Sequence, residues 1–220
     1  MAEIPLILEL KKARHKNIAA AQDLIIEELL RIFSNAVLHG GTAIWRCYKG
    51  NRFSEDIDIY IPRNIEKIDL LFNALTKRGF IVIKKKISKN SLYSEMELNR
   101  TRVRFEAIFK SLKGKLVEYE TIEGNLISIY SLSPEQIINE KVETYLKRLK
   151  IRDLYDIFFL IRYVKEGKEI KEKINKLIKN YKRPIDEKEL KILIIKGLIP
   201  RTKDMLIYIK DFLKWEKKNI

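Results

Sequence analysis

The sequence contains only one cysteine, Cys47, among 220 residues. A single thiol cannot form an internal disulfide, and it excludes zinc sites built from several cysteines. Glycine and proline are also scarce, with 8 and 5 residues, and no low-complexity tract or fixed-period repeat occurs, which argues against long disordered linkers and solenoids. The chain shows no signal-peptide pattern and no apolar run long enough to span a membrane. We therefore expect a folded protein of the cytoplasm.

Acidic residues are outnumbered by basic ones. The chain has 30 Asp and Glu against 45 Lys and Arg, which gives a formal net charge of +15. A field of this sign attracts polyanions, so a nucleotide or a nucleic acid is the expected partner. The alternative is that the lysine-rich composition reflects a thermophilic source, in which many lysines form solvated ion-pair networks.

The patterning divides the chain into an N-terminal α/β lobe, residues 1–132, and a C-terminal helical lobe, residues 133–220. In the first lobe, apolar residues at three- and four-residue steps predict helices over 14–33 and 65–77. Strands are predicted over 36–39, 56–61, 80–83, 94–98, 102–109, 117–122 and 126–130. Those that begin at residue 80 or later are expected to form an antiparallel series. We expect an α+β fold with a mixed sheet, and a cleft between the lobes as the binding site.

The helical lobe begins at a capping box, Ser133-Pro134-Glu135-Gln136, with proline at the first helical position. A further helix is predicted over 153–164. Two or three lysine-rich helices follow, with breaks near 183–184 and 197–200.

Two aspartates on the predicted strand 56–61 carry the clearest chemical signal. Asp56 and Asp58 are two residues apart, so their side chains point to the same face of the strand. Carboxylate and phosphate oxygens are the ligands that magnesium prefers, and two ions about 4 Å apart can bind the attacking and leaving oxygens of a phosphoryl displacement. Together with the small-residue turn at Gly40-Gly41, the pair predicts a magnesium-dependent nucleotidyl transfer site.

A third acidic residue is expected from a neighbouring strand. In the segment 102–109, Glu106 lies on the polar face and is the candidate third metal ligand. Arg104 lies on the same face, where it could bind a phosphate.

The motif Gly-Gly-Thr-Ala at residues 40–43, followed by Arg-Phe-Ser-Glu-Asp-Ile-Asp at 52–58, resembles the AbiEii/AbiGii-type nucleotidyltransferase toxins. This family, with its MenT branch, belongs to the DNA polymerase β-like superfamily. A second block, Glu140-Lys141-Val142, Arg148 and Arg152-Asp153-Leu154-Tyr155-Asp156, is similar to the second motif region of the family. The resemblance covers residues from about 36 to 160.

The resemblance implies roles for individual residues. Gly40, Gly41, Thr42 and Arg46 would belong to the nucleotide-binding segment, where the family often has lysine in place of Arg46. Lys141 and Asp156 would complete the catalytic set, with Asp153 as a weaker member. If one helical phase is maintained, Lys141, Arg148, Arg152 and Asp156 share one face, and the two arginines could neutralise a triphosphate.

The predicted activity is transfer of a nucleoside monophosphate from a nucleoside triphosphate, with two Mg²⁺ ions. The resemblance implies an RNA acceptor, most concretely the 3′ end of tRNA, and a toxin countered by a cognate antitoxin. One alternative is nucleotidyl transfer to a protein or a small molecule. A different class is a non-catalytic nucleotide- or RNA-binding module that retains the fold.

Overall fold

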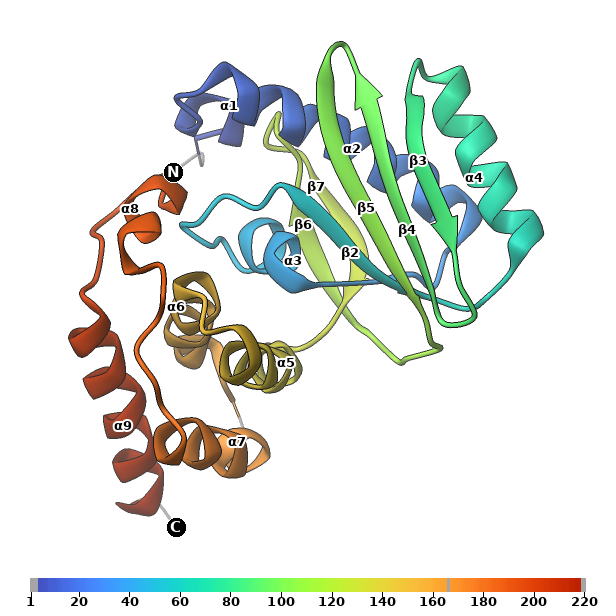
Figure 1. The fold of residues 1–220 in the computed structure, drawn as a ribbon. Helices are drawn as coiled ribbons and strands as arrows, with labels where there is room; N and C mark the ends of the chain where they lie inside the picture. The colour runs from blue at the N-terminus through green and yellow to red at the C-terminus, as the bar shows by residue number, and fades with distance from the viewer. Residues whose placement is uncertain (1–3, 166, 219–220) are drawn as a thin grey trace. The chain divides into compact units, whose positions relative to one another are not determined.

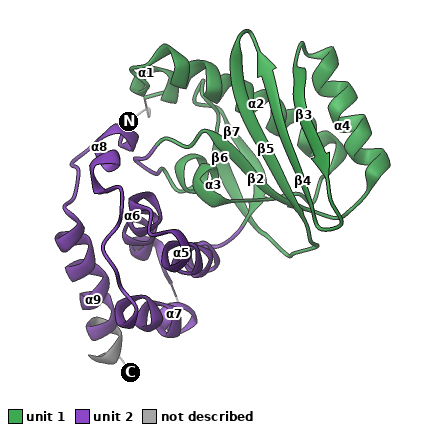
Figure 2. Cartoon of the chain, viewed as in Figure 1, with its two compact units in different colours: residues 1–49, 53–131 green, residues 50–52, 132–220 purple. Residues whose placement is uncertain are grey.

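The computed structural model describes residues 4–165 and 167–218, with side-chain surroundings up to Lys214. The described chain forms two compact units (Figure 2). Unit 1 contains the residues up to Lys49 and Phe53–Ser131, and unit 2 contains Gly50–Arg52 and the residues from Leu132 onward. The chain thus leaves unit 1 for three residues and returns to it at Phe53.

Unit 1 is built on a seven-stranded sheet with the order β3-β4-β5-β2-β1-β7-β6 (Figure 1). The strands are β1 (Val37–His39), β2 (Asp56–Ile61), β3 (Ile81–Ile87), β4 (Ser91–Leu98), β5 (Thr101–Phe109), β6 (Lys115–Glu120) and β7 (Leu126–Ser131). Two of the pairings, β2 with β5 and β1 with β7, are parallel, and the others are antiparallel.

The mixed sheet expected from the sequence is confirmed, but the continuous antiparallel series predicted after residue 80 is wrong. β5 does not pair with β6, because its second edge pairs with β2 along the whole length of that strand. Strand order in a sheet is set by such long-range pairings, which the period-two pattern of each strand does not encode.

In the described part of unit 1, four helices accompany the sheet: α1 (Leu6–Glu9), α2 (Ala13–Ile32), α3 (Gly40–Cys47) and α4 (Ile65–Lys77). In Figure 1, the long helix α2 passes behind the strands, and α4 lies beside β3 at the right of the sheet. Ile18, Ile25 and Leu29 form part of the buried face of α2, at the predicted helical spacing. Asn64 caps α4 by accepting a hydrogen bond from the backbone N–H of Lys67 at 2.9 Å, which satisfies a donor of the first turn.

Unit 2 is helical in its described part. Its elements are α5 (Pro134–Arg148), α6 (Ile151–Leu160), the 3-10 helix η1 (Ile161–Tyr163), α7 (Lys168–Lys179), η2 (Glu187–Glu189), α8 (Leu190–Leu193) and α9 (Thr202–Lys218). The predicted capping box is present: the Ser133 hydroxyl accepts from the N–H of Gln136, and the Gln136 side chain accepts from the N–H of Ser133.

The helical phase breaks between α5 and α6. Leu149 adopts a left-handed conformation with φ of 52° and ends α5, and α6 begins two residues later. Lys141, Arg148, Arg152 and Asp156 therefore do not share one continuous helical face, and that prediction is corrected.

Candidate active site

An acidic cluster forms where β1, β2 and β5 run side by side. Asp58 pairs with Glu106 across the parallel β2–β5 ladder, and His39 is the partner of Asp58 on β1. Residues directly opposite each other on neighbouring strands point to the same face of the sheet. The structure therefore brings Asp56, Asp58 and Glu106 to one face, with β5 as the neighbouring strand that the sequence predicted.

Arg104 is the cation of this cluster. Its guanidinium lies 2.7 Å from a carboxylate oxygen of Asp56 and is about half exposed. Three carboxylates and one guanidinium leave a formal charge of −2. Burial raises the pKa of Glu106, and the neighbouring Asp58 and Asp56 charges raise it further, because an ionised glutamate beside two carboxylates is unfavourable.

The acidic cluster fits a magnesium ion that is only partly ligated by protein. Within the described ranges, no group of three or more His, Cys, Asp or Glu side chains is arranged to hold a metal by itself. Magnesium, however, usually binds one or two carboxylates together with water and substrate phosphates. A pair that includes Asp58, with a surplus of negative charge around it, meets that requirement.

Gly40 and Thr42 connect α3 to β2. Gly40 has φ of +69°, and a Cβ atom at this position would overlap the Asp58 carboxylate, so the site requires glycine for its conformation and for space. The Thr42 hydroxyl donates a hydrogen bond to the backbone carbonyl of Asp56, and the residue is fully buried. In this structure Thr42 therefore fastens the start of the helix to the strand that carries the aspartates. Its contact with the nucleotide stays a prediction.

Arg46 lies inside unit 1, and its contacts differ from those predicted. The guanidinium is buried, forms an ion pair with Asp23 of α2, and donates from Nε to the Tyr119 hydroxyl at 3.0 Å. The Tyr119 hydroxyl in turn donates to Asp23 at 2.8 Å. One cation and one anion neutralise each other, so Arg46 is explained by its role in holding α3 against α2 and β6.

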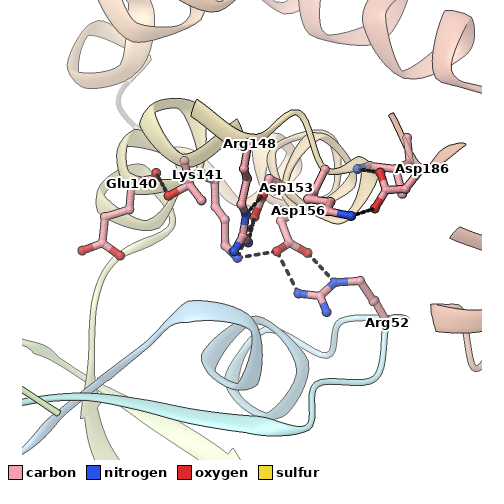
Figure 3. Close-up of polar contacts among 10 residues, drawn as sticks. Arg52, Glu140, Lys141, Arg148, Asp153, Asp156 and Asp186 are labelled. Atoms are coloured by element: carbon pink, nitrogen blue, oxygen red, sulfur yellow. Dashed lines mark hydrogen bonds and ion pairs between the residues drawn. The ribbon is translucent and has the colours of Figure 1, made fainter. Parts of the chain in front are cut away.

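A basic cluster lies in unit 2 (Figure 3). Lys141 Nζ of α5 is 2.7 Å from Asp156 Oδ2 and 3.5 Å from Asp153 Oδ1. Arg148 binds Asp153 through two nitrogens, at 2.7 and 2.8 Å. The turn at Leu149 thus brings the end of α5 and the first turns of α6 together, and four of the predicted residues meet by this route.

Arg52 is a member of the basic cluster that the sequence did not reveal. Its Nε and Nη2 atoms donate to the two oxygens of Asp156, both at 2.8 Å, and both side chains are buried. Burial opposes the charged form of Asp156, but the Arg52 and Lys141 cations more than offset it and lower the pKa of this carboxyl. The signal for Arg52 was its place at the start of the Arg-Phe-Ser-Glu-Asp-Ile-Asp motif.

Arg152, by contrast, stays outside this cluster. It is half-buried on α6, and no ion pair joins it to Asp153 or Asp156 in the described part of unit 2. The break at Leu149 accounts for the difference, because it shifts α6 out of the phase on which the prediction depended.

Residues 29–213 match the family model described as "Nucleotidyl transferase AbiEii toxin, Type IV TA system". A search of curated proteins gave no match. No helix of the described residues is both long and apolar enough to cross a membrane.

Solved structures share the fold at low sequence identity. JHP933 from Helicobacter pylori is 21% identical, with a TM-score of 0.65 over 94% of this chain and 95% of that protein. MenT4, a nucleotidyltransferase toxin from Mycobacterium tuberculosis, is 16% identical, with a TM-score of 0.63 over 97% of this chain and 93% of MenT4. Since the family model spans well over half of the sequence, this chain belongs to the AbiEii family of nucleotidyl transferase toxins of type IV toxin–antitoxin systems and is a nucleotidyltransferase.

Proposed function

We propose that this enzyme transfers a nucleoside monophosphate from a nucleoside triphosphate to a hydroxyl of RNA, most concretely the 3′ end of tRNA, in the cytoplasm. The observation that carries the proposal is the pairing of Asp58 with Glu106 beside Gly40. Asp58, with Asp56 or Glu106, would hold Mg²⁺. The bound ion would polarise the phosphate oxygens and stabilise the charge that develops on the leaving group.

The chemistry of transfer assigns a task to each group. The acceptor hydroxyl oxygen forms a bond to the α-phosphorus, the bond from that phosphorus to the bridging oxygen breaks, and pyrophosphate leaves. The hydroxyl proton passes to a carboxylate: where Asp56 and Asp58 hold the ion, Glu106 is the carboxylate of the acidic cluster that is left to accept it. In the basic cluster, Lys141 and the partly exposed Arg148 would neutralise triphosphate oxygens.

Net charge supports RNA as the acceptor. A surplus of fifteen basic side chains favours a polyanion over a neutral small molecule or an average protein surface. The family description as a toxin of a toxin–antitoxin system supports a cognate antitoxin as a further partner.

The test is labelling with each of the four nucleoside triphosphates, with Mg²⁺, and with either total tRNA or a protein lysate. We expect label in tRNA, lost on chelation of the metal and reduced at least about 100-fold by Asp58→Asn. Asp204→Asn is the matched control, because Asp204 is a partly exposed aspartate whose partner is Arg201. Label on protein would show that the acceptor is a protein and not RNA. No label on any acceptor would contradict the proposal.

A further inference from the structure

The five charged residues of the basic cluster do not sum to zero. Arg52, Lys141 and Arg148 are cations, and Asp153 and Asp156 are anions, so the cluster has a formal charge of +1. Asp153 and Asp156 are fully buried. The exposed fractions of the Arg52 and Lys141 side chains are 6% and 10%, whereas that of Arg148 is 40%. A buried surplus charge is costly unless something of opposite charge binds it.

The contacts show which cation is the surplus one. Each aspartate is already held by the two-nitrogen fork of an arginine: Asp156 by Arg52, and Asp153 by Arg148. Such a bidentate pair satisfies one carboxylate with one guanidinium. Lys141 approaches both carboxylates as a third cation, at 2.7 and 3.5 Å. Its ammonium is therefore held in place by two acids without being neutralised by them.

Arg52 reaches this position from far away in the sequence. It is 104 residues from Asp156, and the segment that carries it is fixed within unit 2 by two backbone contacts. Arg52 forms an isolated antiparallel bridge with Ile194, and the N–H of Ile195 donates to the Asn51 carbonyl at 2.8 Å. The backbone that carries the guanidinium is thus anchored, so the Arg52–Asp156 ion pair has a defined geometry, unlike a pair between mobile surface side chains.

We infer that Arg52 is a positioning residue that sets the charge of the basic cluster: by neutralising Asp156, it leaves the Lys141 ammonium available to a triphosphate. The inference rests on the proposed function, because it assumes that the anion is the triphosphate of the substrate. Without Arg52, Asp156 would pair with Lys141 alone, and the formal charge of the cluster would fall from +1 to 0.

Three variants separate this role from simple packing. Arg52→Gln lowers the charge to 0, Asp156→Asn raises it to +2, and the double variant R52Q/D156N restores +1 with a neutral amide pair in the place of the ion pair. Arg183→Gln is the control for the chemical change, since Arg183 is an exposed arginine of unit 2 whose nearest acid is 3.8 Å away.

The experiment is calorimetric titration of the full-length protein with inorganic tripolyphosphate, which removes the unknown base from the measurement. We expect R52Q to bind about tenfold more weakly than the wild type, the scale for loss of one unit charge within about 10 Å in a partly buried site. R52Q/D156N should bind within about threefold of the wild type, D156N at least as tightly, and R183Q unchanged.

The outcomes distinguish the role of Arg52 from the proposed triphosphate site itself. A purely structural role predicts weaker binding for all three cluster variants, and that result would overturn the inference, as would wild-type affinity in R52Q. If R52Q does not fold by circular dichroism, the double variant decides, because it replaces both members of the Arg52–Asp156 ion pair and leaves neither of the two buried without the other. Failure of the wild type itself to bind tripolyphosphate would contradict the proposed triphosphate site, and the inference with it.

Discussion

Two buried arginines, Arg46 in unit 1 and Arg52 in unit 2, are used in different ways. Arg46 meets one aspartate and one tyrosine hydroxyl, and the charges there cancel. Arg52 meets an aspartate that also binds Lys141, in a cluster with one cation in excess. Arg46 follows the Gly-Gly-Thr-Ala motif and Arg52 begins the Arg-Phe-Ser-Glu-Asp-Ile-Asp motif, so position near a motif does not tell their roles apart. The balance of charge around each side chain does tell them apart.

Removal of Asp156 should have the largest effect on stability, because it leaves two buried cations without their shared carboxylate. We expect Asp156→Ala to lower the free energy of unfolding by about 5 kcal/mol, measured by urea denaturation. Asp204→Ala, in the partly exposed pair with Arg201, should leave the free energy of unfolding close to that of the wild type, because solvent screens such a pair. A loss of under about 2 kcal/mol for Asp156→Ala would mean that Lys141 and Arg52 find other partners.

Asp23, Arg46 and Tyr119 form a neutral network, in which the two charges cancel. Removal of Asp23 tests this network in the same way, but it leaves one cation unpaired, whereas removal of Asp156 leaves two. Asp23→Ala should cost about 3 kcal/mol, since Arg46 would stay buried beside Tyr119 without its anion. Urea denaturation of the two alanine variants side by side gives the comparison. If Asp23→Ala proves the more damaging of the two, the surplus charge assigned to unit 2 is not a feature of that cluster.

Tyr119→Phe removes one hydroxyl from the neutral network and leaves both charges in place. The hydroxyl donates to Asp23 and accepts from Arg46, so its loss should cost about 1.5 kcal/mol. Thermal unfolding should show the shift with an unchanged far-ultraviolet spectrum. An unshifted midpoint would indicate that the Asp23–Arg46 pair alone holds α3.

Glu106→Gln extends the comparison to the acidic cluster, where the surplus is negative. The pKa of Glu106 is raised in the folded protein by burial and by Asp58 and Asp56, so its ionisation opposes folding at neutral pH. The variant should be more stable by about 0.5 kcal/mol at pH 7. The gain should shrink as the pH falls through the raised pKa and vanish below the ordinary value of 4.5, where the glutamate is protonated in both states.

That stability gain should come with a loss of nucleotidyl transfer. Denaturation at pH 7 and pH 4, together with the labelling assay, checks both effects. A Glu106→Gln variant that is destabilised at pH 7 would contradict the charge surplus on this face of the sheet.

Local pattern was enough to predict most elements. The helix over 65–77 and the strand over 56–61 have the bounds of α4 and β2, because apolar periodicity and the flanking Asn64 and Pro62 mark their ends. The alternation of residues on β2 and β5 also predicted that Asp56, Asp58 and Glu106 share a face. These features depend only on neighbouring residues.

Features that depend on distant contacts were not predictable. Nothing in the period of β2 indicates that its partners are β1 and β5 in that order. The left-handed residue at Leu149 is not a glycine, so the break between α5 and α6 had no local marker. The pairing of Arg52 with Asp156 joins segments with no common periodicity, and the buried setting of Arg46 depends on side chains from α2 and β6.

The placement of Gly50–Arg52 in unit 2 has a consequence for how this protein can be cut or recombined. A fragment that starts at residue 132 would lack the guanidinium that holds Asp156 and the Asn51 carbonyl that anchors Ile195. Neither unit is one uninterrupted stretch of the gene. A chimaera that exchanges the helical part with a relative must therefore carry the Gly50–Arg52 insert along with it, and a crossover at residue 132 alone would separate residues that have to be inherited together.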